Sequence, residues 1–240
     1  MNTAPLTART SYWHGMREGG PFILIVFPFG IVFGVAAIEA GFSLTQTMAF
    51  TISAYAGAAQ LTAIQLMSES APLAIVILTA LAVNARMAMY SASLAPHLGK
   101  APMWHRALMG YLMVDQTYAL SSMAYDRFPQ MSLAAKTGYY FGVASLIWPV
   151  WVAGSLAGAV VGNLIPSWVP LGFAVPIAFM AMVGPMLRTF AHVAAALVSV
   201  IGALVFSPVP YSLGLLIAAV LAMVTGALVE TWMLRRKPSA

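Results

Sequence analysis

The chain has 240 residues, of which 61% are hydrophobic and only 7% are charged, and its formal net charge is +5. A soluble domain has about 25% charged residues, so this composition excludes a water-exposed surface over most of the chain and predicts a lipid solvent. The sequence contains no cysteine, which excludes disulfides and cysteine-based metal or haem motifs. Its few positive charges lie at segment ends, where they suit anionic lipid headgroups rather than nucleic acid.

Apolar runs predict an all-α, polytopic membrane helix bundle with about eight transmembrane segments. The expected segments are 20–39, 43–67, 71–98, 104–125, 138–162, 169–187, 189–206 and 213–233. Segment 43–67 carries many polar groups around Gly57, which is typical either of a broken helix that lines a cavity or of a tightly packed helix. Segment 104–125 is the least hydrophobic and either spans the membrane or lies in its interface, so the count is eight or seven.

Glycines four residues apart predict close helix contacts in the first and fifth segments. These glycines are Gly30, Gly34, Gly154 and Gly158. A glycine-spaced span followed by a glycine-interrupted one occurs at 20–67 and again at 138–187, which indicates an internal repeat. We therefore also expect a broken helix at 169–187, where Pro176 and Gly184 interrupt the apolar run.

We expect a single transmembrane domain over 1–240, with a cytoplasmic N-terminal segment at 1–19 and a cytoplasmic basic tail at 234–240. The apolar run after residue 19 is too long for the core of a signal peptide, so we interpret it as a retained span. Eight spans with both termini in the cytoplasm put most lysines and arginines on the inner side, as the positive-inside rule requires. Only Lys100 and Arg106 then fall on the outer side.

Arg86 lies about two-thirds of the way along its span, where an arginine costs a few kcal/mol unless it faces protein or a wet cavity. The alternative is that its side chain snorkels to the interface. Its expected partner is Asp115, which shares one helix face with Tyr111 and Tyr118 if 104–125 is helical. The two charges either neutralise each other or bind a zwitterion, with arginine on the carboxylate and aspartate on the ammonium group. Asp115 is also the candidate proton carrier.

Neutral groups nearby would complete a substrate site around these two charges. They are Tyr55, Gly57, Gln60, Asn84, Tyr90 and Gln116. No zinc-protease motif or phosphate-binding loop is present in the sequence, and its histidines lack metal-ligand spacing, so we expect no enzyme activity, metal or cofactor. A passive channel for small polar solutes and a structural membrane subunit remain the alternative functions.

Several stretches carry a family resemblance. They are Pro28-Phe-Gly-Ile-Val-Phe-Gly34, Tyr55-Ala-Gly-Ala-Ala-Gln60, Val83-Asn-Ala-Arg86, Tyr90-Ser-Ala-Ser-Leu-Ala-Pro-His97 and Val114-Asp115-Gln116. Together they resemble the AzlC family of bacterial branched-chain amino acid permeases, the large subunits of two-component exporters. The resemblance implies proton-motive-force-driven export of valine, leucine and isoleucine across the inner membrane, with methionine as a further candidate. It also implies a small, separately encoded AzlD-type membrane subunit as partner.

Overall fold

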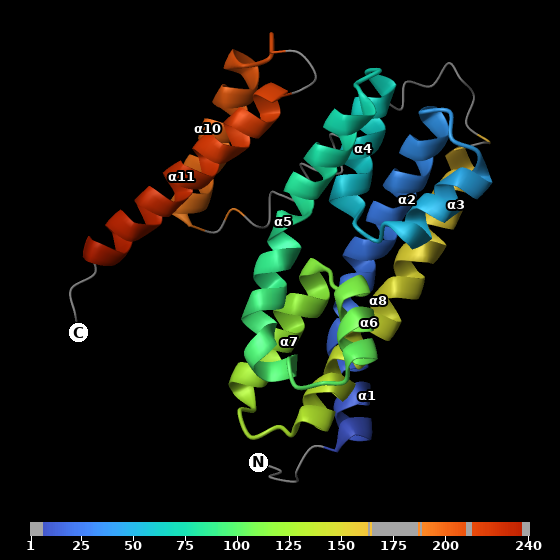
Figure 1. Cartoon of the computed structure of the whole chain (residues 1–240), viewed down its shortest axis with the longest axis vertical. Helices are drawn as coiled ribbons and strands as arrows, with labels where there is room; N and C mark the ends of the chain where they lie inside the picture. The colour runs from blue at the N-terminus through green and yellow to red at the C-terminus, as the bar shows by residue number, and fades with distance from the viewer. Residues whose placement is uncertain (1–6, 163, 165–186, 188, 210–212, 237–240) are drawn as a thin grey trace.

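The computed structural model describes residues 7–162, 164, 187, 189–209 and 213–236, and all regular structure in these ranges is helical (Figure 1). The helices are α1 (Ala8–Gly19), α2 (Ile23–Glu39), α3 (Leu44–Ser53), α4 (Gly57–Ser68), α5 (Leu73–Leu98), α6 (Met103–Tyr111), α7 (Asp115–Arg127), α8 (Leu133–Gly162), α10 (Phe190–Val205) and α11 (Leu213–Arg236). The predicted all-α fold is therefore confirmed for these ranges. The expected broken helix at 169–187 lies outside the described residues.

Within the described ranges, four continuous helical stretches are long and apolar enough to cross a membrane. They are Ala8–Glu39, Leu73–Leu98, Leu133–Gly162 and Leu213–Met233, with 32, 26, 30 and 21 residues. At about 1.5 Å per residue, each one reaches across the roughly 30 Å hydrocarbon core of a bilayer. Helix α10 is apolar but shorter, with 16 residues. The expected count of about eight spans is therefore not confirmed over the described ranges.

The polar segment 43–67 is a hairpin of two short helices. Helix α3 begins with a capping box, in which the side chains of Ser43 and Gln46 each accept a hydrogen bond from the other's backbone N–H. The helical structure is interrupted between Ser53, where α3 ends, and Gly57, where α4 begins. The two helices have 10 and 12 residues, so each extends only about 15–18 Å. Figure 1 shows that α4 returns to the end of the bundle from which α3 entered. A break near Gly57 was one of the two interpretations of this segment, but the return to the same end was not expected.

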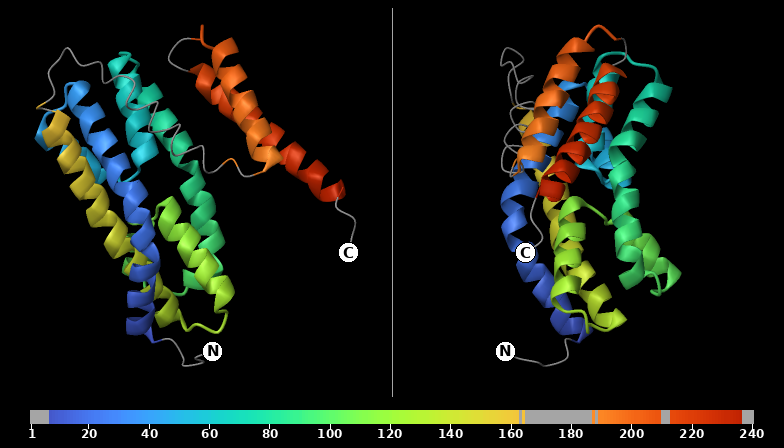
Figure 2. Two further views of the ribbon diagram at one scale, coloured as in Figure 1. Left: turned by 180° about the vertical axis from the view of Figure 1, so that it is seen from behind. Right: turned by 90° about the vertical axis from the view of Figure 1, so that its left-hand side faces the viewer.

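Segment 104–125 forms a second hairpin, which enters the bundle from the opposite end (Figures 1 and 2). Helices α6 and α7 have 9 and 13 residues, and the chain between them turns at Leu112, Met113 and Val114. The expectation of one continuous helix with a polar stripe is therefore wrong, because Tyr111 ends one helix and Asp115 begins the next. Neither a single spanning helix nor a single interfacial helix describes this segment.

The hairpins change the side on which two basic residues lie. Because the α3–α4 hairpin returns to the end from which it entered, α5 runs back along the bundle, and the connection from α5 to α6 lies at the same end as the N-terminus (Figure 1). Lys100 and Arg106, which we assigned to the opposite side, therefore lie at the N-terminal end together with Arg127. The wrong assignment followed from counting the α3–α4 hairpin, which precedes both residues, as a membrane span.

Helices α2 and α8 form the scaffold against which both hairpins pack. A Cβ atom added to Gly34 would overlap the carbonyl oxygen of Ser155, and one added to Gly158 would overlap the carbonyl oxygen of Ile31. Only glycine permits backbones to approach this closely, so the close helix contacts predicted for each of these segments are confirmed, and the two segments make them with each other. Gly30 and Gly154 lie against each other in the same way.

Side chains from elsewhere in the bundle bond backbone carbonyls near the hairpin breaks. Gln60 donates its side-chain amide to the carbonyl of Phe50 at 2.9 Å, which ties α4 to α3. Tyr111 donates its hydroxyl to the carbonyl of Ile52 at 2.6 Å, which ties the tips of the two hairpins together. These bonds hold both tips at mid-height in the bundle (Figure 1).

Candidate functional site

A cavity lies where the two hairpin tips meet α2, α5 and α8. Five of the eight residues that the sequence analysis selected line it: Tyr55, Gly57, Arg86, Asp115 and Gln116. The α3–α4 hairpin supplies the first two, α5 supplies the arginine, and the first turn of α7 supplies the last two. The structure therefore brings together, from three separate segments, the polar groups that were expected to form one site.

Arg86 and Asp115 form an ion pair inside this cavity, with 3.2 Å between Nη1 and Oδ2. Their side chains are 36% and 46% exposed, so the pair is not sealed in the protein interior. Asp115 is the first residue of α7, where the helix dipole stabilises a carboxylate. The Nε atom of Arg86 is buried and has no hydrogen-bond partner among the described residues. The arginine therefore retains a donor beyond those that hold the aspartate.

Tyr90 orients the carboxylate from the neighbouring turn of α5. Its hydroxyl donates to Oδ1 of Asp115 at 3.0 Å, and its ring stacks on that of Tyr118 with 4.1 Å between centroids. The hydroxyl of Tyr118 in turn bonds that of Ser93 at 3.2 Å. Two hydrogen bonds, linked by the stacked rings of Tyr90 and Tyr118, thus lie along the contact between α5 and α7.

Three of the selected residues do not line the cavity. Tyr90 acts through Asp115, and Gln60 is fully buried and fastens α3 to α4. Asn84 precedes Arg86 by two residues on α5, and its side-chain oxygen is buried without a hydrogen-bond partner in the described structure. The side-chain oxygen of Gln60 is also buried without a partner in the described part of the chain.

The sequence analysis missed the apolar wall of the cavity. Phe29 of α2 and Trp151 of α8 form it with several aliphatic side chains, and their ring centroids are 5.7 Å apart. Trp151 is only 4% exposed, and its indole N–H is buried without a partner among the described atoms. Tryptophans in membrane proteins are enriched at the membrane–water interfaces, so the position of Trp151 in the middle of a span is the sequence feature from which this wall could have been predicted.

A separate polar network lies at the N-terminal end of the bundle, away from this cavity. Glu18 of α1 pairs with Arg127 of α7 at 3.4 Å and accepts a hydrogen bond from Tyr139 of α8. His97 and Lys136 are bonded to each other at 3.0 Å nearby. Within the described ranges, no group of three or more His, Cys, Asp or Glu side chains is arranged to hold a metal ion.

Comparison with known proteins gives relatives that are membrane proteins. An uncharacterized membrane protein of Helicobacter pylori is 30% identical over 134 residues, which cover 56% of this chain and 57% of the relative. The inner membrane protein YgaZ of Escherichia coli is 25% identical over 183 residues, or 74% of each chain. A membrane protein of Archaeoglobus fulgidus is 27% identical over 231 residues, or 95% of this chain and 97% of the relative. The chain thus matches little more than half of the Helicobacter relative's length.

No solved structure matches the chain. The family model described as AzlC protein matches residues 21–165, well over half of the 240 residues. The matched region contains α2 to α8, and therefore both hairpins and the pair of Arg86 and Asp115. Its limits agree with the part of the fold that builds the cavity. The chain belongs to the AzlC family of membrane proteins.

Proposed function

We propose that this AzlC-family protein is a secondary active transporter that exports branched-chain or similar apolar amino acids across the bacterial inner membrane. The observation that carries the proposal is the composition of the central cavity. The ion pair of Arg86 and Asp115 lines this cavity, and so do the aromatic side chains of Phe29 and Trp151. A zwitterion with an apolar side chain presents the same three features, which are an anion, a cation and an apolar surface.

The two charged ends of such a substrate have complementary partners in the cavity. Arg86 has a free Nε donor and a planar fork that suits a carboxylate. Asp115 would receive the ammonium group once the substrate carboxylate draws the guanidinium away. Gln116 and Tyr55 would add neutral hydrogen bonds, and Asn84 would support Arg86 from the same helix. Substrate binding would thus exchange one internal ion pair for two pairs with the substrate.

Proton coupling would also run through Asp115. It is the carboxylate that lines the cavity, and Tyr90 places a hydroxyl on its Oδ1 atom. If Asp115 binds the ammonium group in one half of the cycle and a proton in the other, substrate and proton compete for one carboxylate. Such competition couples their movements in opposite directions without a cofactor.

The charge distribution supports an inner-membrane orientation with the N-terminal end of the bundle in the cytoplasm. Six basic residues of the first 162 lie at that end: Arg9, Arg17, Lys100, Arg106, Arg127 and Lys136. The opposite end carries the acidic residues Glu39 and Glu69. This asymmetry follows the positive-inside rule. The name of the Escherichia coli relative, an inner membrane protein, agrees with this location.

We propose that the small AzlD-type subunit binds to the outer face of α5. Leu78, Leu81 and Met89 are 61%, 62% and 63% exposed there. The same helix carries Arg86, whose 36% exposure at mid-span is unfavourable against lipid. A second membrane subunit at this helix would cover the open side of the ion pair.

The test is efflux from cells preloaded with labelled valine, leucine, isoleucine or methionine. The chain is expressed with and without its small partner, and each culture is measured with and without a protonophore. We expect efflux that requires both subunits, saturates, and stops when the proton gradient is removed. Efflux equal to that of empty cells, with the protein present in the membrane, would refute the amino acid assignment. Flux that rises linearly with concentration and shows no counterflow would instead indicate a channel.

A further inference from the structure

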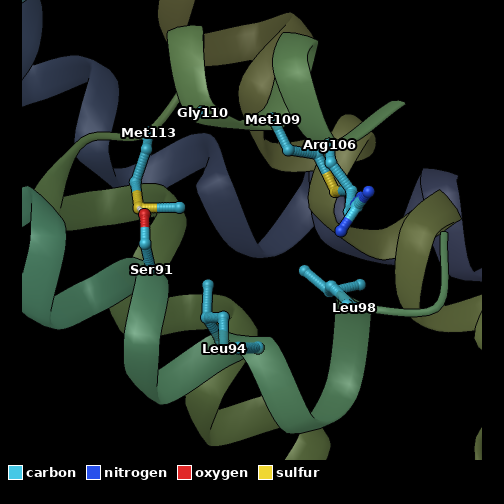
Figure 3. A pocket seen from close by; sticks show the side chains of 9 residues that line it. Ser91, Leu94, Leu98, Arg106, Met109, Gly110 and Met113 are labelled. Carbon is cyan, nitrogen blue, oxygen red and sulfur yellow. Dashed lines mark hydrogen bonds between the residues drawn. The ribbon is translucent and has the colours of Figure 1, made fainter. Parts of the chain in front are cut away.

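A second cavity lies between α5 and α6, and no part of the proposed central site uses it. Figure 3 shows Leu94 and Leu98 of α5 facing Arg106 and Met109 of α6 across this space. The cavity holds about 200 Å³, below the roughly 300–1,000 Å³ of pockets for drug-sized ligands, so it suits a small molecule. Its lining residues recur every three or four positions along α5, so the cavity is a groove that follows the helix for about two turns.

The inner end of this groove adjoins the central cavity. Met113 lines the groove, and the next residue along the chain, Val114, lines the central cavity. The hydroxyl of Ser91 donates to the sulfur of Met113 at 3.6 Å, which closes the contact between α5 and the hairpin tip (Figure 3). Ser91 directly follows Tyr90, which bonds Asp115. Ser91 and Met113, which bond each other in the groove, thus each lie one residue along the chain from a residue of the central site.

The outer end of the groove carries a positive charge at the N-terminal end of the bundle. Arg106 is exposed and forms no ion pair with any residue that the structure describes. Its guanidinium contacts only the sulfur of Met103, at 3.5 Å, among the hydrogen-bond contacts of the described residues. A guanidinium without a carboxylate, set beside leucine and methionine side chains, complements a molecule with an anionic end and an apolar body.

We infer that this groove is an entry site, in which an apolar amino acid binds from the N-terminal end of the bundle before it reaches the central cavity. Arg106 binds the carboxylate, and Leu94, Leu98 and Met109 contact the apolar side chain. Displacement of Met113 from Ser91 then opens the way to Asp115. The inference rests on the proposed function, because it assigns a second binding site to the same substrate class.

The chain has no cysteine, so single-cysteine variants can be labelled without background. Ala95→Cys places a thiol in the groove, and Ala107→Cys places one on α6 outside it; both alanines are exposed. In inverted membrane vesicles, we expect a hydrophilic maleimide to label Ala95→Cys and leucine to slow this labelling. Leucine should not change the labelling of Ala107→Cys. Labelling of Ala95→Cys by lipid-soluble maleimide alone would show that the groove faces lipid, and would overturn the inference.

Arg106→Gln tests the role of the charge in transport. We expect the leucine concentration for half-maximal efflux to rise about tenfold, the effect of one lost hydrogen bond to a charged group, with little change in the maximal rate. Arg106→Lys should recover part of the loss, and leucine should no longer slow labelling in an Arg106→Gln, Ala95→Cys variant. An unchanged half-maximal concentration would overturn the entry site while the efflux of the parent protein upholds the proposed function. A parent without amino acid efflux would overturn both.

Discussion

Gly57→Ala tests the architecture of the central cavity with one methyl group. Gly57 is the first residue of α4, and a Cβ atom there would lie 2.7 Å from Cη2 of Trp151 and 2.9 Å from Cε1 of Phe29. Carbon atoms in contact prefer separations of about 3.5–4.0 Å, so both rings must retreat by about 1 Å. Trp151 has little room to do so, because Phe33 packs against it with 5.6 Å between ring centroids.

Overpacking of this kind costs about 1–3 kcal/mol of folding stability. For a chain of this size, each kcal/mol lowers the melting temperature by about 2–4 °C. Because the displaced indole moves within the cavity wall, we also expect efflux of leucine and isoleucine to fall more than efflux of valine. The assay is thermal unfolding of the purified protein, together with efflux of the three labelled amino acids. Gly20→Ala is the matched control, since nothing lies within 4 Å of its added Cβ.

A second variant separates this mechanism from general damage. Trp151→Phe removes Cη2, the nearer of the two ring atoms that the new methyl group contacts. The effects of Trp151→Phe and Gly57→Ala on stability should therefore be clearly non-additive. The double variant should lose less stability than the sum of the two single changes. If Gly57→Ala melts like the parent and keeps the same ratio of leucine to valine efflux, the close contact of α4 with the aromatic wall is not present in the working protein.

Two further predictions address the charges and the scaffold. Arg86→Asp and Asp115→Arg should each lower the amount of protein in the membrane, because each leaves two like charges together; the double swap should restore the amount but not the efflux. Efflux by the double swap would show that the pair is purely structural. Gly34→Ala should destabilise the fold by about 1–3 kcal/mol or more, because backbone atoms of α8 cannot yield to its Cβ. Melting temperatures compared with Gly20→Ala measure the effect, and equal values would contradict the packing of α2 on α8.

The glycine contacts and the ion pair could be predicted from the sequence because each depends on a residue type that has few uses in lipid. Glycines such as Gly34 and Gly158 at a four-residue spacing have a main structural role, which is close backbone approach. Arg86 needs a partner near mid-membrane, and Asp115 was the central acid that could provide it. Both inferences depended on the chemistry of individual residues. Neither required knowledge of how the chain folds between those residues.

The α6–α7 hairpin could not be predicted, because its turn carries no residue that breaks a helix. Leu112, Met113 and Val114 are ordinary apolar residues in a membrane segment, with no glycine or proline among them. The turn has one tertiary contact, in which Tyr140 of α8 donates its hydroxyl to the carbonyl of Met109 at 2.7 Å, and one local contact, in which the Thr117 hydroxyl accepts from the N–H of Val114 at 2.8 Å. A partner on a distant helix, such as Tyr140, leaves no local pattern, so 104–125 resembled one continuous helix.

The helices of the bundle differ in how tightly they are packed together. Backbone contact at Gly34 and Gly158 locks α2 to α8, and a shift there would require overlap of main-chain atoms. The hairpin tips are joined by one hydrogen bond from Tyr111 and by ring contact between Tyr55 and Tyr111, with 6.1 Å between centroids. A rigid pair of helices with two short hairpins entering from opposite ends supplies one movable element for each side of a membrane. The α3–α4 tip borders the ion pair, and the α6–α7 tip carries its acid, Asp115. Under the proposed function, movement of one hairpin at a time would open the site to one side of the membrane, which is the requirement for alternating access.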